Sequence, residues 1–444
     1  MRATSIHDWQ IRRPVSGPRA RGACGGSAGR RAFRWWVLAS LIVSAACTTQ
    51  VPTWALGPAA PSDQRDEETA SATFVPLPVV SLSQTRGRTL GVTPLVLIRD
   101  AEDSVGTVLA PSITYNEYTR LRGRFRLYRF FSAGGSARLV ASVAQRNDFQ
   151  LSSNYEDPAF LHRRVWLYVG GVVEDRGRER FYGIGPEASL EEETNYSRGR
   201  AELDAWTGYR LLAPLEIRLR LRLARMWVSP GIVPGVRDTL DEFPDLSFAE
   251  GHRTLAPRVS LRYDSRDDDD RPTSGAVALA GAELSARRLG SSASFARFDA
   301  ELQGFAPLWT DRVISAARVR AVHVEPLRGD RLPWLELSRL GGADTLRGFT
   351  RERFADAASV LASYEARIRV LTTEFGDTAV DWEVAPFVDA GAVAPRATEL
   401  RADDVQVSAG LGLRAGLRAG LVGRVDLAVS DEAFKFNAEL RYPY

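Results

Sequence analysis

The alternation of apolar and charged residues with a period of two is the feature of this 444-residue chain that most limits its fold. In Leu215–Leu223 the odd-numbered residues are Leu or Ile, and the even-numbered ones are Glu or Arg. Because successive side chains of a β-strand point to opposite faces, this pattern predicts strands with one apolar and one charged face. The same alternation recurs at residues 295–303, 360–370 and 435–442. The sequence therefore predicts an all-β protein.

The first 47 residues have the features of an export leader. Residues 1–34 hold eight arginines and one acid, and an apolar run from Trp35 to Ala46 follows. A basic region before an apolar segment of this length is typical of a secretory signal, and the segment is too short to cross a bilayer as a helix. Cleavage after Ala55 and cleavage before Cys47, with lipidation of that cysteine, are alternatives. We expect the chain to be exported.

Removal of the leader reverses the net charge of the chain. The loss of eight arginines and Asp8 leaves 50 basic and 54 acidic side chains, a formal charge of about −4 instead of +3. The basic balance therefore belongs to the leader and argues against nucleic acid as a partner. Residues 48–73 are rich in Ala, Thr, Pro and acids without apolar periodicity, which predicts a disordered linker. Residues 74–444 then form one β-structure.

Alternation alone fits both a soluble sandwich, whose apolar faces meet in a core, and a membrane barrel, whose apolar face meets lipid. From Phe74 to Tyr444 no apolar run approaches the ~20 residues of a membrane-spanning helix. Export, strand-like segments of about ten residues and aromatic residues near strand ends favour the barrel. These aromatic residues are Tyr128, Phe130, Phe131, Trp166, Tyr168 and Trp227. We predict a transmembrane antiparallel β-barrel with charged side chains facing a polar lumen.

The sequence has few features of a catalytic or metal-binding protein. It contains neither a Gly-x-Ser-x-Gly elbow nor a His-Glu-x-x-His segment. His162 and His252 lie beside arginines, a context typical of exposed basic turns. The acids at Asp264 and Asp267–Asp270 gather where a strand ends, which favours a solvated turn over a divalent-cation site. We expect no enzymatic activity, no cofactor and no metal.

Six short motifs give the chain a resemblance to a known family. They are Pro76–Val80, Phe181–Pro186, Tyr263–Asp267, Leu340–Phe349, Phe387–Gly391 and Gly410–Arg414. In this order they resemble the BamA/TamA (bacterial surface antigen) family of outer-membrane β-barrels. The resemblance implies sixteen strands, a place in the bacterial outer membrane, and a loop that folds into the lumen.

The resemblance also implies a site inside the barrel. Its parts are a lumen-loop motif and a strand motif that faces it, namely Leu346, Arg347, Gly348 and Phe349 with Phe387, Asp389 and Gly391. In the family the loop arginine pairs with the strand aspartate, here Arg347 with Asp389, and a guanidinium and a carboxylate in a water-poor lumen favour bidentate contact. The two glycines would let the backbones approach. The alternative is that both charges are solvated on opposite sides of a wide lumen.

The end of the chain resembles the C-terminal signal by which assembly machinery recognises barrel proteins. The alternation at Phe434–Tyr442 predicts a closing strand, and the chain ends on an aromatic residue. Its marker residues are Phe436, Leu440, Tyr442 and Tyr444. Pro443 lacks a backbone donor, so the seam between the last and first strands should be short or frayed near Tyr444.

The resemblance implies insertion or translocation of outer-membrane clients through this lateral seam. The expected partners are outer-membrane lipid, unfolded β-barrel clients and a separate periplasmic protein, because residues 48–73 are too few for even one POTRA domain of the kind that receives clients in the family. The alternative is a plugged pore or a structural surface-antigen barrel without assembly activity.

Overall fold

A computed structural model describes residues 47–50, 71–81, 87–99, 105–131, 134–163, 165–375, 378–417, 422–439 and 442–444. The predicted leader up to residue 46 and residues 51–70 of the predicted linker lie outside the described residues. At the two described ends of that linker, β1 pairs with β2 as antiparallel strands. The boundaries of leader, linker and barrel stay predictions.

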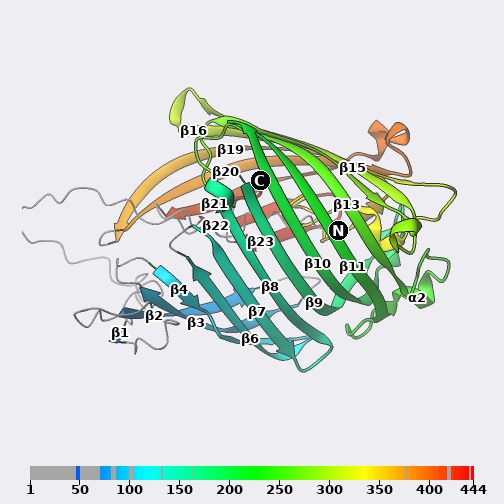
Figure 1. Cartoon of the computed structure of the whole chain (residues 1–444), viewed down its shortest axis with the longest axis horizontal. Coiled ribbons are helices and arrows are strands. Elements are labelled where there is room, and N and C mark those ends of the chain that lie inside the picture. The colour runs from blue at the N-terminus through cyan, green and yellow to red at the C-terminus, as the bar shows by residue number, and fades with distance from the viewer. Residues whose placement is uncertain are drawn as a thin grey trace, which may run out of the picture.

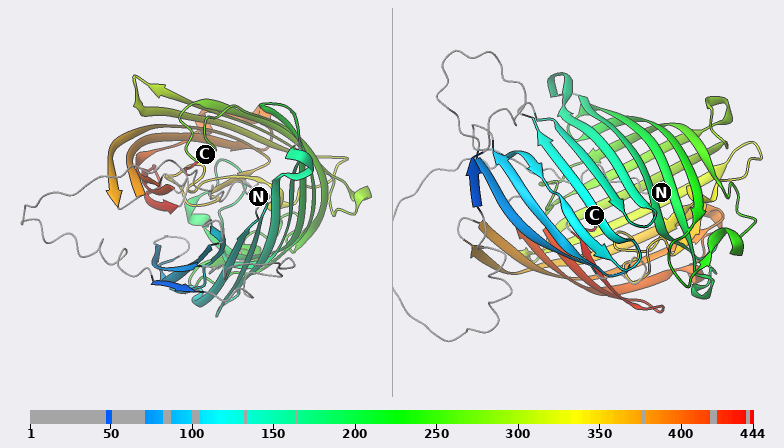
Figure 2. Two further views of the ribbon diagram at one scale, coloured as in Figure 1. Left: turned by 60° about the vertical axis from the view of Figure 1, so that its left-hand side comes forward. Right: turned by 90° about the horizontal axis from the view of Figure 1, so that it is seen from below.

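One antiparallel sheet makes up most of the molecule and curves into a barrel (Figure 1, Figure 2). Its 21 strands are β1 (Cys47–Gln50), β2 (Ser71–Ser81), β3 (Thr89–Arg99), β4 (Val105–Leu109), β5 (Ser112–Asn116), β6 (Arg120–Phe130), β7 (Ser136–Ala144), β8 (Asp148–Ala159), β9 (Val165–Phe181), β10 (Thr194–Leu212), β11 (Leu215–Pro230), β12 (Arg237–Asp238), β13 (Gly251–Asp264), β14 (Gly275–Ser285), β15 (Phe295–Leu308), β16 (Thr310–Pro326), β19 (Ala358–Phe375), β20 (Thr378–Ala394), β21 (Gln406–Leu417), β22 (Val422–Val429) and β23 (Phe434–Glu439). Long strands pair with the next long strand along the chain, so the topology is a meander of hairpins. The prediction of an antiparallel β-barrel is confirmed.

Helices contribute little to the structure. The described residues contain α1 (Phe160–Arg163), α2 (Thr239–Glu242) and single 3₁₀ turns at Leu190–Glu192, Arg287–Leu289, Trp334–Glu336, Ala397–Glu399 and Ala402–Asp404. Within this part of the chain, no helix has the length and apolar character needed to cross a membrane. β17 (Ser338–Leu340) and β18 (Phe354–Asp356) form a second, two-stranded sheet, which is not part of the barrel wall but contacts β19 through Ser338 and Ser359.

The number of strands that cross the barrel depends on how the short ones are counted. β4 and β5 both pair with β6 in one continuous register, so they are two halves of a strand interrupted at Ala110 and Pro111. β1 has four residues and β12 has two. The sixteen strands implied by the family resemblance stay a prediction.

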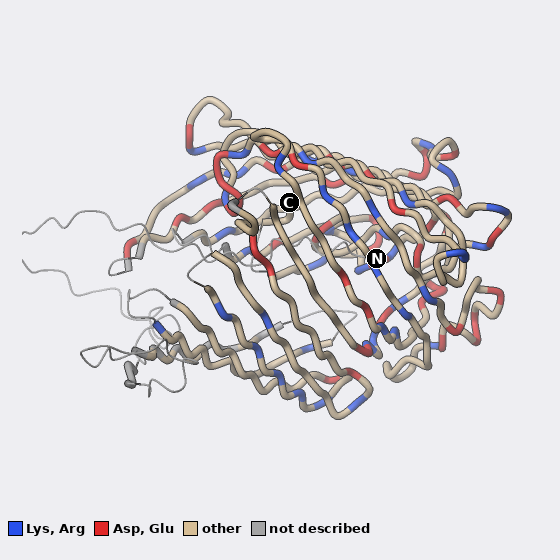
Figure 3. The backbone as a smooth tube through the Cα atoms, in the orientation of Figure 1, with Lys and Arg blue, Asp and Glu red and all other residues tan. Residues whose placement is uncertain are grey.

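The burial of β11 decides between a sandwich and a membrane barrel. Leu219, Leu221 and Leu223 are each about half exposed, whereas Arg218 and Arg222 are buried. The apolar face therefore points outwards and the charged face inwards, which is the reverse of a soluble protein in water and the arrangement of a barrel in lipid. Figure 3 shows charged positions recurring along many strands of the wall.

The longer connections lie at one end of the barrel. They follow β9, β11, β16 and β20, which end on the same side because successive strands alternate in direction. The opposite end has tight turns such as Ala213-Pro214 between β10 and β11, and Trp309 between β15 and β16. Short turns on the periplasmic side and longer loops outside are usual for outer-membrane barrels.

The seam between the ends of the sheet is open among the described residues. β23 pairs with β22, and β2 pairs with β3 and β1, but no described residue of β23 pairs with β2 or β1. Of the predicted closing-strand markers, Phe436 lies in β23 with its ring partly exposed, and Leu440 lies outside the described residues.

The prediction that the closing strand continues to Tyr442 and Tyr444 is corrected. The strand ends at Glu439, and Tyr442 turns into the lumen, where its hydroxyl donates to Glu383 at 2.7 Å and its ring lies 3.9 Å from the Arg367 guanidinium carbon. The Tyr444 hydroxyl donates to the Ala316 carbonyl. These contacts hold the end of the chain inside the barrel, and Pro443 lacks the backbone donor that further strand pairing would need.

Candidate functional site

The connection from β16 to β19, residues 327–357, is called here the lumen loop. Its β17 and β18 pair as a short hairpin, and the hairpin carries its tip, Gly341–Arg353, into the barrel. Thr345 stabilises the tip by accepting a hydrogen bond from the Gly341 amide at 2.8 Å. The tip therefore brings the predicted loop motif to the inner wall.

Arg347 is the centre of the contacts between the lumen loop and the wall. Its Nε donates to Oδ2 of Asp389 and its Nη2 donates to Oδ1, each at 2.8 Å, and its backbone amide also donates to Oδ2. Nη1 donates to Glu365 at 3.0 Å. The guanidinium carbon lies 3.5 Å from the centre of the Phe387 ring. Arg347 and Asp389 are each 1% exposed, so this bidentate pair is fully withdrawn from solvent.

The electrostatics of Arg347 follow from these contacts. Burial by itself would lower the pKa of Arg347, but its hydrogen bonds to Asp389 and the charges of Asp389 and Glu365 raise the pKa above its ordinary value. Arg347 therefore stays charged, and removal of its side chain would leave two buried carboxylates without this cation.

Glu365 links the loop to a wider network of charges. It accepts hydrogen bonds from Arg347, from Arg367 at 2.7 Å and from Arg414 at 3.2 Å. Arg414 in turn pairs with Asp426 on β22. One buried carboxylate on β19 therefore joins the loop to β21 and, through Arg414, to β22.

Two glycines permit the close approach of the loop to the wall. A Cβ at Gly348 would lie 2.6 Å from the Cβ of Ser408 and 2.9 Å from the Val429 carbonyl oxygen. A Cβ at Gly391 would lie 2.8 Å from the Val360 carbonyl oxygen and 3.0 Å from Leu340. The strand motif thus makes room for the loop, although Gly348 meets β21 and β22 rather than Gly391.

Apolar packing also holds the loop tip against the wall. Leu346 is fully buried, and the Phe349 ring packs edge-on against Phe354 at 5.1 Å. Their cluster comprises Leu340, Leu346, Phe349, Phe354, Leu361 and Val393. Since its members come from the loop, β19 and β20, burial of this cluster holds the tip on the same strands as the Arg347 contacts.

The loop also contacts the last two strands of the barrel. Asn437 of β23 donates to the Arg347 carbonyl and Ser430 donates to the Gly348 carbonyl, both at 3.0 Å. Arg424 of β22 donates to the Ala343 carbonyl at 2.8 Å. The backbone of the motif is therefore attached to the strand at the seam.

A second buried charge anchors the loop on the other wall. Glu336 is fully buried, and it accepts hydrogen bonds from Arg222 of β11 and Arg297 of β15. Burial would raise the pKa of Glu336, but the charge of Arg222 and the hydrogen bond with His252 hold it well below its ordinary value. His252 thus contacts a carboxylate in an interior network and is not the exposed basic turn that the sequence indicated.

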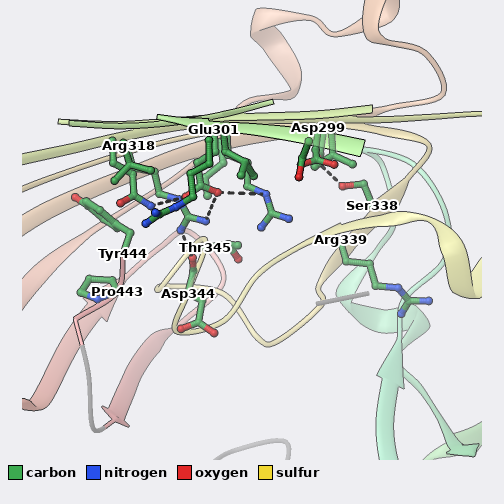
Figure 4. A pocket seen from close by; sticks show the side chains of 18 of the residues that line it. Asp299, Glu301, Arg318, Ser338, Arg339, Asp344, Thr345, Pro443 and Tyr444 are labelled. Carbon is green, nitrogen blue, oxygen red and sulfur yellow. Dashed lines mark hydrogen bonds and ion pairs between the residues drawn. The ribbon is translucent and has the colours of Figure 1, made fainter. Parts of the chain in front are cut away.

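A cavity of about 430 Å³ lies between the loop and the wall of β10 to β16. Figure 4 shows Asp344 and Thr345 of the loop and Pro443 and Tyr444 of the C-terminus in the same space as Glu301 and Arg318. Arg318 donates to Glu301 and to the Asp344 carbonyl, both at 3.0 Å. The loop and the end of the chain therefore share one charged chamber.

The sequence predictions and the structure differ in the extent of this site. The structure brings together the seven residues of the two predicted motifs, but Tyr442 and Tyr444 lie in the lumen instead of at a closed seam. Sequence reasoning missed Glu365, Arg414, Arg424, Asn437 and Glu336. Alternation along β19 and β21 places Glu365 and Arg414 on the charged face, but it does not indicate which charges meet.

Comparisons with known proteins bear on the family and the fold. The model of the Omp85 superfamily domain matches residues 129–438. Among solved structures, BamA from Haemophilus ducreyi lacking POTRA domains 1–3 is similar at 15% identity and a TM-score of 0.52, over 82% of this chain and 74% of that one. CdiB from Escherichia coli is similar at 10% identity and the same TM-score of 0.52, over 82% of this chain and 65% of that one. Comparison with curated protein sequences gives no match.

Proposed function

Because the chain belongs to the Omp85 superfamily, we propose that it is an integral barrel of the bacterial outer membrane that assists insertion or translocation of clients through the seam between β23 and β2. Its partners in this proposal are outer-membrane lipid, unfolded β-barrel clients and a separate periplasmic protein that delivers them. The likeness to BamA and CdiB at this level of identity supports the fold, and the activity is argued from the seam.

The observation that carries the proposal is the unpaired edge of β23. One edge of this strand pairs with β22, and no described residue of β2 or β1 covers the other. The chain end, which would otherwise extend the strand, is held in the lumen by Arg367 and Glu383. An unpaired edge presents backbone donors and acceptors that can template another strand.

The opposite edge, on β2, is poorly suited to templating. Pro76 is opposite Pro94 in the register of β2 and β3. Two prolines can face each other only at a pair without mutual hydrogen bonds, so the nitrogen of Pro76 points away from β3, and that of Pro78, two residues further on, points the same way. The free edge of β2 therefore lacks two consecutive donors, which leaves β23 as the edge for a client strand.

The lumen loop connects this edge to the buried site. Asn437 of β23 is bonded to the backbone of Arg347, whose side chain is fixed by Asp389. We expect loss of the Arg347 side chain to release both the loop tip and the edge strand.

The test is a client-folding assay in liposomes. The purified protein is inserted, an unfolded small β-barrel is added, and client folding is followed by the heat-modifiable gel shift. We expect faster folding than in protein-free liposomes, and loss of most of the acceleration in Arg347→Ala. The matched control is Arg396→Ala, which removes an exposed arginine from the connection after β20.

The outcomes separate the proposal from its rival. Acceleration by the wild type and by Arg396→Ala, but not by Arg347→Ala, supports an assembly function. A folded wild-type protein that gives no acceleration contradicts it.

A plugged pore is the second candidate function, because the lumen loop occupies the barrel interior and contacts both walls, through Glu336 on one side and Arg347 on the other. In that case deletion of Gly341–Arg353 should raise single-channel conductance in planar bilayers severalfold, while the wild type accelerates no client. An unchanged conductance after deletion would exclude the plug.

A further inference from the structure

The wall formed by β4 to β8 has a surplus of positive charge in the lumen. Strand β6 alternates, with Leu121 and Phe125 exposed on the outer face and Arg122, Arg124 and Arg126 on the inner one. Arg122 has a partner, because its Nη2 lies 2.6 Å from Asp148. The next two arginines along the strand differ from it in this respect.

Among the described residues, Arg124 and Arg126 have no hydrogen bond or ion pair. Arg138 of β7 lies beside Arg126 and stacks on Tyr128 at 5.4 Å, and it forms no ion pair with a carboxylate in the part of the chain that the structure describes. The Nε atoms of Arg124 and Arg138 are buried without a partner. Arg124, Arg126 and Arg138 are called here the β6–β7 arginine cluster.

The neighbouring strands cannot neutralise this cluster. Arg124 is flanked by Ser112 on β5 and by Ser142 on β7. Arg126 is flanked by Val140, and its carbonyl accepts from the amide of Ala110. All four neighbours are buried and uncharged. Asp148 acts electrostatically on Arg124, but its carboxylate is already paired with Arg122 and Arg178 among the described residues.

The rest of the lumen shows that such a surplus is not general. Arg220 pairs with Asp204, Arg258 with Asp299 and Arg318 with Glu301. Guanidiniums close to one another and partly desolvated are unfavourable unless an anion joins them. The planar donors of Arg match the oxygens of a phosphate group, each guanidinium contributing two N–H groups.

We propose that the β6–β7 arginine cluster binds a phosphate group, carried either by a free phosphate or by a phospholipid headgroup. The turn between β6 and β7 lies at the end of the barrel with the tight turns, so the ligand enters from that end. Serine hydroxyls at Ser112 and Ser142 supply further donors beneath the guanidiniums. This site is separate from the seam and does not depend on client insertion.

Binding to the full chain in a neutral detergent tests the proposal. Isothermal titration uses inorganic pyrophosphate in one arm and dihexanoyl phosphatidic acid in the other, at low and at high salt. We expect saturable binding in at least one arm and a Kd raised about tenfold in Arg124→Gln and in Arg126→Gln, the size expected for one charge-assisted hydrogen bond. Binding in only one arm identifies the source of the phosphate.

The matched control is Arg146→Gln, in the exposed turn between β7 and β8 of the same wall, which should bind like the wild type. Arg124→Lys keeps the charge without the planar donors and should give an intermediate Kd. Each variant is checked for an unchanged heat-modifiable gel shift, so that a folding defect is recognised. Absence of wild-type binding in both arms, or variants that bind as tightly as the wild type, would overturn the proposal.

Discussion

The two walls that flank the seam differ in how their lumen charges are matched. On the wall from β19 to β23, Arg347, Arg367 and Arg414 share the buried Glu365. On the wall from β2 to β8, Arg124, Arg126 and Arg138 have no carboxylate partner among the described residues, and the edge strand β2 carries prolines. The comparison shows that charge matching holds the loop and the last strands together, whereas the first strands are not tied into this network.

The difference bears on which side of the seam can change. A network of buried, mutually bonded charges resists rearrangement because each broken pair leaves an uncompensated charge. The first wall lacks such bonds to the loop among the described residues. We therefore expect β2 and β3 to move away from β23 more readily than β22 and β23 move away from the loop.

The largest expected effect is that of Arg347→Ala on stability. Its removal leaves Asp389 and Glu365 buried without their shared cation, which typically costs about 3–5 kcal/mol of unfolding free energy. Denaturant titration followed by tryptophan fluorescence measures this loss. Arg396→Ala, at an exposed ion pair, should change it by less than about 0.5 kcal/mol. An equal loss of unfolding free energy in the two variants would mean that the buried charge network does not hold the loop on the wall from β19 to β23.

Part of this site was accessible from the sequence, and the reason lies in local patterns. Alternation at Leu215–Leu223 predicts which face is charged, and the structure confirms that the charged side chains of β11 point inwards. The pairing of Arg347 with Asp389 is implied by the resemblance of two short motifs to those of a known family. Both kinds of signal are carried by residues that are close together in sequence.

The other contacts of the site join strands that are far apart in sequence. Glu365 and Arg414 meet only because β19, β20 and β21 lie side by side, and no local signal selects this pair over others on the same faces. Alternation predicts that the closing strand runs to Tyr442, and the resemblance of the chain end to the C-terminal signal adds Tyr444. Arg367 and Glu383 come close to Tyr442 only when the barrel is folded, so the turn of the chain end into the lumen could not be inferred from the sequence.

A smaller loss of unfolding free energy is expected when an added side chain prevents the loop tip from packing closely against the wall. In Gly348→Ala the new Cβ would lie within 3 Å of Ser408 and of the Val429 carbonyl, so the loop must shift from β21 and β22. Overpacking of this kind costs about 1–3 kcal/mol of unfolding free energy. Gly304→Ala on β15 meets no atom within 4 Å and is the control. If both substitutions lowered the unfolding free energy equally in denaturant titration, the loop would not be closely packed against β21 and β22.

Substitution of the prolines on the edge of β2 should stabilise the barrel instead of destabilising it. Replacement of Pro76 and Pro78 by Thr restores two outward donors, which should allow β2 to pair with β23 and close the seam. We expect a higher temperature for the heat-modifiable gel shift and slower client folding, each a modest effect. Pro395→Thr, in the exposed connection after β20, is the control. A client-folding rate that rises in the double variant would mean that β2, not β23, is the templating edge.

The smallest effect concerns the entrance of the lumen loop, where Asp330 joins it to the turn after β14. Hydrogen bonds from Arg287 and from the Ser294 amide lower the pKa of Asp330 to about 2 from an ordinary value of 3.8. A carboxylate with a lowered pKa in the folded state stabilises it above the unfolded pKa, and this contribution is lost as the pH falls through the folded pKa. The extra protection of residues 286–294 in the wild type relative to Asp330→Asn should therefore be present at pH 5 and largely lost at pH 2, as measured by hydrogen exchange. Since Asp330 lies outside the buried network, Asp330→Asn should leave the Arg347 contacts intact. Faster hydrogen exchange in the loop tip, Gly341–Arg353, of this variant would instead show that the buried network depends on the exposed contacts of Asp330.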